Sequence, residues 1–224
     1  MAVFFNRIRA RKAVGPSGKN LWKNCAGTAV MEFAIVGPVF IAFLLAIMYT
    51  MLIYLAQQML ETTAEGAGRL MLTGFAQTTQ SPNGTVGLTA SDFKTAICNG
   101  LSGTNPAGEA VSTPRLLPPL LSCSRLTVNV SVATTYNVAD ATNSPTFTYD
   151  SDGILVSTGT GYNYQSGGSG KNRIVVLQLI YLWPTGKGPL GLNLINEPNA
   201  NRKLVATSVF TTEDYACPAS QPSC

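Results

Sequence analysis

Residues 33–56 form an uncharged, strongly apolar run of 24 residues, and this run limits what the chain can fold into. Only Gly37, Pro38 and Thr50 interrupt it, and each does so weakly. A helix needs about 20 apolar residues to cross the hydrocarbon core of a bilayer. The run therefore predicts a membrane-spanning helix over residues 28–56 in preference to a buried helix of a soluble core.

The positive charge of the chain is concentrated before this run. The formal net charge is +4, but six basic residues lie before Gly27 with no acidic residue among them, which leaves the rest of the chain at −2. Basic residues beside the first span stay in the cytoplasm, so we expect residues 1–27 to be a cytoplasmic leader and the C-terminal part to lie across the membrane. A mildly acidic remainder also argues against a nucleic-acid partner. The six residues are Arg7, Arg9, Arg11, Lys12, Lys19 and Lys23.

The helical pattern continues beyond the apolar run as an amphipathic extension over residues 57–80. Apolar residues recur every three or four positions up to Phe75, while Glu61, Glu65 and Arg69 fall together on another face. This spacing predicts one continuous helix over residues 28–76. Gly74 and the polar stretch that begins at Thr78 should end it.

The remaining residues, 81–224, predict an α+β domain with a few antiparallel strands. Thr89 and Asp92 have the spacing of a capping box that opens a short helix. Three later stretches have the composition of strands, and the middle one is apolar enough to be central. The predicted fold is a long N-terminal helix packed on a small antiparallel sheet of about three strands. These strands are Leu126 to Val132, Ile174 to Trp183 and Leu204 to Thr212.

A long connection, residues 136–170, separates the first two strands. Connections of this length are uncommon in compact domains, so it is either a functional loop or a solvated loop with an extra hairpin. Asp150 and Asp152 resemble the start of a calcium loop, but Gly161 stands where the final acidic ligand belongs. We therefore expect no calcium site there.

Four of the five cysteines follow the apolar run, where an oxidising compartment would allow them to pair. Three pairings are possible, and we favour Cys98 with Cys123 and Cys217 with Cys224. The first pair brackets a helix-to-strand connection and the second closes the C-terminal tail. The chain has no histidine and no zinc-type cysteine spacing, so no metal and no cofactor are predicted.

The junction between leader and span carries one unusual feature, a glutamate inside the start of an apolar helix. Glu32 follows Gly27 by five residues and directly precedes Phe33. A carboxylate at the centre of a membrane helix costs about 3 kcal/mol, and less near its end. Either Glu32 lies at headgroup level, or a positive group meets it.

This junction resembles the processing site of type IV prepilins, and more closely that of the TadE-like pseudopilins of the tight-adherence (Tad/Flp) pilus system. Three later features are similar to that family: Trp183–Pro184 at the end of a strand, a closing strand over residues 203–210, and the Cys98 and Cys123 pair. The resemblance covers residues 27–214. The long connection and the tail with Cys217 and Cys224 depart from it.

The resemblance implies a non-enzymatic subunit that a prepilin peptidase cuts after Gly27. Thr28 would then carry the free amine that Glu32 partly neutralises, and Gly37 with Pro38 would bend the helix for packing. It also implies a single-pass protein of the bacterial inner membrane with a periplasmic domain, which a pilus can incorporate. The implied partners are membrane lipid, the prepilin peptidase, other pilin or pseudopilin subunits and the assembly platform.

Two alternatives remain open from the sequence. One is an envelope protein of the pilus apparatus that stays anchored and is never cut. The other is a membrane-tethered extracytoplasmic enzyme. Without histidine no Ser/His/Asp or Cys/His arrangement can form, and the acidic residues show no distinctive spacing. Carboxylate-pair chemistry depends on spatial neighbours and is left open.

Overall fold

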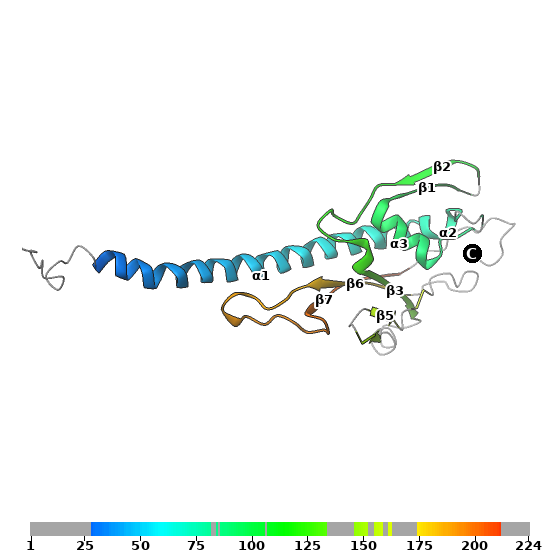
Figure 1. The fold of residues 1–224 in the computed structure, drawn as a ribbon. Helices are drawn as coiled ribbons and strands as arrows, with labels where there is room; N and C mark the ends of the chain where they lie inside the picture. Colours follow the sequence, from blue (N-terminus) through cyan, green and yellow to red (C-terminus); the bar gives the residue numbers. More distant parts are fainter. Residues whose placement is uncertain are drawn as a thin grey trace, which may run out of the picture. The chain divides into compact units, whose positions relative to one another are not determined.

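The computed structural model describes residues 28–81, 84, 86–105, 107–133, 146–151, 155–158, 161–162 and 174–211. The chain divides into two compact units, residues 1–43 and 44–224. The described part of the first unit is helical throughout, and the second contains the sheets (Figure 1). One long helix, α1 (Thr28–Leu72), contributes residues to both units.

Helix α1 ends four residues before the predicted end at residue 76. Gly74 adopts a left-handed conformation with φ 76°, which only glycine takes without steric cost. A one-turn helix, α2 (Phe75–Thr78), follows directly. The amphipathic pattern itself is confirmed, since Leu60, Ala67 and Met71 are buried whereas the three charged residues of the extension, Glu61, Glu65 and Arg69, are exposed.

The three predicted strands form one antiparallel sheet in the order β3-β6-β7. They are β3 (Leu126–Ala133), β6 (Ile174–Pro184) and β7 (Asn201–Thr211). Strand β6 is central and buried along nearly its whole length, as its continuous apolar sequence predicts. Strand β7 begins earlier than predicted and alternates, with Leu204 and Ala206 buried and Val205 and Val209 exposed.

The hydrophobic core forms between the second half of α1, the inner face of the sheet and α3 (Ala90–Asn99). Gly68 marks the close approach of α1 to β7. A Cβ atom at Gly68 would lie 2.8 Å from Ser208 Oγ and 3.5 Å from a ring carbon of Phe210. The absence of that atom allows the last strand to lie directly against the helix.

Helix α3 opens with the predicted capping box. The Asp92 amide donates to Thr89 Oγ1 at 3.3 Å, and the Thr89 amide donates to Asp92 Oδ2 at 3.3 Å. Ser81 Oγ also donates to Asp92 Oδ2, at 2.6 Å. Burial raises the pKa of Asp92, but these hydrogen bonds outweigh burial and hold its pKa below the ordinary value.

One hairpin, β1–β2, and two short helical turns were not predicted, and a second hairpin lies in the long connection. β1 (Leu101–Thr104) pairs with β2 (Ala110–Thr113), and β4 (Phe147–Tyr149) pairs with β5 (Leu155–Thr158). Turns η3 (Cys123–Arg125) and η4 (Pro189–Gly191) precede β3 and β7. The β4–β5 hairpin lies inside residues 136–170, which matches the extra-hairpin interpretation for the described part of that connection.

Candidate functional site

The predicted processing site lies at the edge of the described residues. Thr28 is the first residue of α1, while Gly27 and the leader, including Cys25, lie outside the described residues. Glu32 and Phe33 follow one turn into the helix, and both are exposed. Phe33 has 75% of its surface accessible, so this first stretch of α1 presents an aromatic ring beside a carboxylate.

Gly37 and Pro38 lie inside α1, which continues past them as one helix. A Cβ atom at Gly37 would lie 3.5 Å from Cε1 of the Phe33 ring. The Phe33 ring therefore packs over the glycine that follows it by one helical turn. The role of the pair in bending the helix stays a prediction.

Residues 29–43 of α1 form an exposed apolar surface. The large apolar side chains in this stretch have between 56% and 75% of their surface accessible. Water-exposed surfaces of this extent are rare in soluble proteins and indicate a membrane or protein partner. The helix is long and apolar enough to cross a membrane, with a mean hydropathy of 2.5 in its most apolar part.

The end of the predicted span contacts the protein's own domain. The Tyr49 hydroxyl donates a hydrogen bond to the Thr185 carbonyl and lies 3.4 Å from the Gly186 carbonyl. Ile53 and Ala56 are also buried. One face of residues 49–56 is therefore covered by protein, whereas the sequence alone suggests lipid all round.

The opposite face of the same turns stays apolar and exposed. Its large apolar side chains have between 45% and 69% of their surface accessible. They line an open depression on α1. The lining residues are Met48, Thr50, Met51, Leu52, Tyr54, Leu55 and Gln58.

The disulfide between Cys98 and Cys123 is confirmed, with 5.7 Å between the two Cα atoms. It joins the end of α3 to η3, directly before β3, and so fixes the helix to the first strand of the sheet. The second predicted pair, Cys217 with Cys224, lies outside the described residues and stays a prediction.

A charged and aromatic cluster joins β4 to the start of β7. Lys203 Nζ lies 2.8 Å from Glu197 Oε1 and 4.9 Å from the centre of the Phe147 ring. The Tyr149 hydroxyl donates to Glu197 Oε2 at 2.6 Å. No pattern in the sequence could reveal this cluster, because its members come from segments about 50 residues apart that only the fold brings together.

The cluster shifts the acidity of two of its members. Burial raises the pKa of Glu197. Hydrogen bonds from Lys203 and from the Tyr149 hydroxyl, together with the positive charge of Lys203, outweigh burial and lower that pKa overall. Burial, a hydrogen bond to Glu197 and the charge of Glu197 together raise the pKa of Tyr149. The arrangement favours an ionised carboxylate between a lysine and a neutral phenol.

The acidic residues with described contacts have structural partners. Asp92 caps α3, Glu197 pairs with Lys203, and Glu109 accepts a hydrogen bond from Asn105 Nδ2 at 2.9 Å in the β1–β2 turn. Within the described ranges, no group of three or more Cys, Asp or Glu side chains is arranged to hold a metal ion.

Comparison with known families identifies a match in the N-terminal part of the chain. A model of the TadE-like protein family matches residues 27–69. The match begins at the glycine of the leader junction and covers the exposed apolar part of α1 and most of its amphipathic part. A search of curated proteins and a search of solved structures each found no match.

Proposed function

We propose that this chain, whose residues 27–69 match the TadE-like family, is a non-enzymatic minor pilin or pseudopilin that takes part in assembling or priming a Tad-type pilus. The family match points to a Tad pilus-associated protein. The narrower role rests on the junction itself, where Gly27 is followed by Glu32, Phe33 and an exposed apolar helix. That combination is the single observation that carries the proposal.

The first step is insertion and trimming. The six leader charges hold the N-terminus in the cytoplasm while α1 crosses the bacterial inner membrane and the domain folds in the periplasm. The disulfide between Cys98 and Cys123 suits an oxidising compartment. A prepilin peptidase then hydrolyses the peptide bond between Gly27 and Thr28, which removes all six charges and leaves a free amine on Thr28.

The second step is recruitment through the new N-terminus. Glu32 lies four residues after Thr28, which is about one helical turn. In lipid the carboxylate gains most from a positive partner, and the new amine supplies one in its own chain or in a neighbouring subunit. Phe33 and the exposed apolar side chains that follow would then pack against helices of other pilin or pseudopilin subunits.

The domain supplies the outward contacts. Its sheet, disulfide and capping box support a fixed surface at the end of α1 that other subunits or the assembly platform can bind. Membrane lipid surrounds the span until the subunit is recruited. Asp92, Glu109 and Glu197 serve a helix cap, a turn and an ion pair, which supports a structural role for these three over a catalytic one.

The first prediction tests the cut. We expect Gly27→Ala to block trimming, so that the cellular protein keeps its first 27 residues, because the peptidase must accommodate the chain directly at the cut. Gly18→Ala is the matched control within the same leader and should still be trimmed. Intact mass and N-terminal sequencing of the purified proteins give the result. The wild type and Gly18→Ala should begin at Thr28, and Gly27→Ala should not.

An untrimmed wild-type protein in cells that contain the peptidase would contradict the proposal. It would favour the permanently anchored envelope protein instead.

A further inference from the structure

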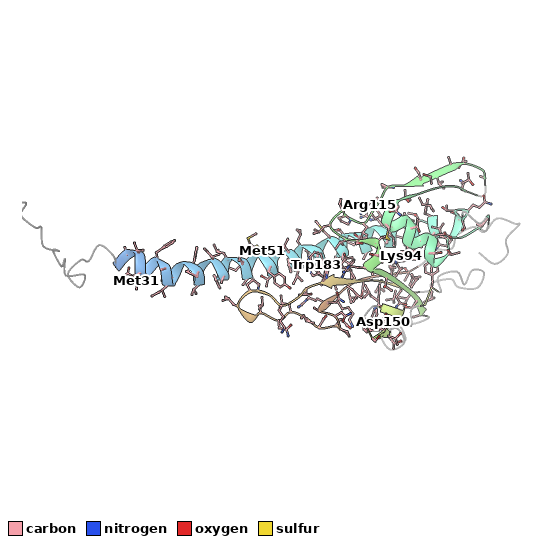
Figure 2. The ribbon with its side chains drawn as sticks, in the orientation of Figure 1. Met31, Met51, Lys94, Arg115, Asp150 and Trp183 are labelled. Carbon is pink, nitrogen blue, oxygen red and sulfur yellow. A yellow bond between two sulfur atoms is a disulfide. The ribbon has the colours of Figure 1, made fainter. Side chains whose placement is uncertain are left out.

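The connection between β6 and β7 lies beside α1 at the place where the helix leaves its own domain. Gly188 lies close enough that a Cβ atom there would be 3.1 Å from the Tyr49 ring, and the Tyr49 hydroxyl binds the Thr185 carbonyl. Figure 1 shows this connection in orange, and Figure 2 labels Trp183 at the end of β6 and Met51 on α1. Among the contacts named above between α1 and the rest of the described domain, those with this connection lie closest to the start of the helix.

The tip of this connection, residues 186–192, combines one exposed leucine with one positive charge. Leu190 has 66% of its surface accessible and a φ of 58°, a left-handed conformation that leucine rarely adopts. Lys187 is exposed and is the only charged residue from Pro184 to Asn196. Leu190 is not among the residues packed against the core, and its left-handed backbone is a strain that points to a contact outside the domain.

The position of Tyr49 in the helix sets the tip at the membrane boundary. The 20 residues from Ala29 to Met48 are enough to cross the hydrocarbon core. Tyrosines concentrate at the membrane–water boundary, and Tyr49 and Tyr54 come directly after those 20 residues, inside the last part of the apolar run. The opposite face of α1, which lines the open depression, carries the same apolar surface past this boundary on the side away from the tip.

We infer that residues 186–192 form a second membrane contact, in which Leu190 enters the leaflet on the domain's side and Lys187 binds anionic headgroups. The inference rests on the proposed function only in requiring α1 to span a bilayer. Continuity with the span and the positive charge favour lipid over a second subunit as the occupant. The contact would fix the height of the domain above the membrane, and recruitment into a fibre would have to withdraw it.

The test, our second prediction, places a tryptophan at the tip of the full chain in vesicles. Leu190→Trp is reconstituted into vesicles of zwitterionic and anionic phospholipids brominated near the top of their acyl chains. Its added fluorescence should be blue-shifted and quenched at least twofold by the brominated lipids. Leu120→Trp is the matched control, since Leu120 is another exposed leucine in a turn, and its added fluorescence should be unquenched.

A charge variant tests the headgroup contact. Lys187→Gln, combined with Leu190→Trp, should reduce quenching in vesicles that contain anionic lipid and leave it unchanged in purely zwitterionic vesicles. Lys94→Gln, on α3, combined with Leu190→Trp, should leave quenching unchanged in both kinds of vesicle.

A mid-span probe separates failure of this inference from failure of the proposed function. Phe40→Trp should be quenched by lipids brominated deep in the chains. If it is quenched and Leu190→Trp is not, the tip contact is wrong and the span stands. If neither is quenched, both the membrane span and the tip contact are wrong. A blue-shifted Leu190→Trp signal without lipid quenching would mean that a second copy covers the tip, which also overturns the inference.

Discussion

Glu32 is exposed on a helix whose neighbouring side chains are almost all apolar. In water such a carboxylate would need no explanation, but in lipid it needs a partner of opposite charge. The proposed cut creates such a partner one turn away. Loss of the Glu32 charge should therefore reduce pilus assembly and leave the folding of the domain almost unchanged.

The third prediction follows from this separation. Glu32→Gln keeps the shape of the side chain but removes its charge, so we expect normal insertion and trimming with pilus assembly reduced about tenfold or more, as the loss of one charge-assisted contact implies. Glu65→Gln, at an exposed acid on the same helix, is the control and should assemble normally. Counting assembled pili per cell measures both, and equal assembly by the Glu32 variant would remove the proposed role of the carboxylate.

Two side chains of the β4–β5 hairpin contact β7 and the turn before it. Phe147 and Tyr149 on β4 contact Lys203 and Glu197, and Glu197 is the member bonded to both a cation and a phenol. Ion pairs that are partly exposed contribute little, whereas a carboxylate with several hydrogen bonds contributes more. The hairpin should therefore open independently of the sheet.

The fourth prediction tests this local opening. Glu197→Gln should weaken hairpin docking by about 1 kcal/mol, so amide exchange in β4 should become about fivefold faster while exchange in β6 stays unchanged. Glu109→Gln is the control, because Glu109 also accepts a side-chain hydrogen bond but in the β1–β2 turn. Hydrogen exchange with mass spectrometry distinguishes them, and faster exchange throughout the sheet would contradict a local role.

The two charged networks also make the stability of the whole chain depend on pH. The folded pKa values of Asp92 and Glu197 lie below their ordinary values, so both carboxylates stabilise the fold fully above about pH 4. That stabilisation is lost as the pH falls through the lower folded values. The pKa of Tyr149 is raised in the fold, so its contribution is present below about pH 10 and is lost as the pH rises further.

The fifth prediction is a stability profile that falls on both sides. Urea unfolding of the full chain in detergent should show a lower midpoint at pH 3 than at pH 6, with about 1 kcal/mol or less lost per carboxylate because solvent screens both groups. The double variant Asp92→Asn with Glu197→Gln should weaken the fall in stability at low pH. Tyr149→Phe should weaken the fall in stability at high pH. An acid side as steep in the double variant as in the wild type would show that other groups control it.

Patterns that repeat over several residues predicted most of the fold. The apolar run, the alternation in β7, the continuous apolar sequence of β6 and the Thr89–Asp92 capping box each lie within one stretch, and the structure contains all of them. Strand β3 forms where it was predicted, but its burial does not alternate, because Asn129 and Ser131 are buried as well. Strands β1 and β2 were missed because four residues such as Leu-Ser-Gly-Thr are too few to show a period. The pairing of Cys98 with Cys123 was chosen correctly from three possibilities.

What the sequence could not reveal depends on contacts between distant segments. The contact of Tyr49 with Thr185 joins residues 136 positions apart, and the Glu197 cluster joins β4 to β7. Such contacts follow from the strand order and from the way α1 crosses the sheet, neither of which has a local pattern. For the same reason the far end of the span looks uniformly apolar in sequence, although one of its faces is covered by protein.

The place of β7 determines when the domain can close. This strand is the last described element of the chain, yet it supplies one whole edge of β6 and the surface that meets Gly68 of α1. During export α1 would reach the membrane first. The face of α1 that is buried in the folded domain would stay uncovered until β7 has followed. A chain interrupted between the end of α1 and Asn201 would therefore be inserted but left open, with no native strand to complete it.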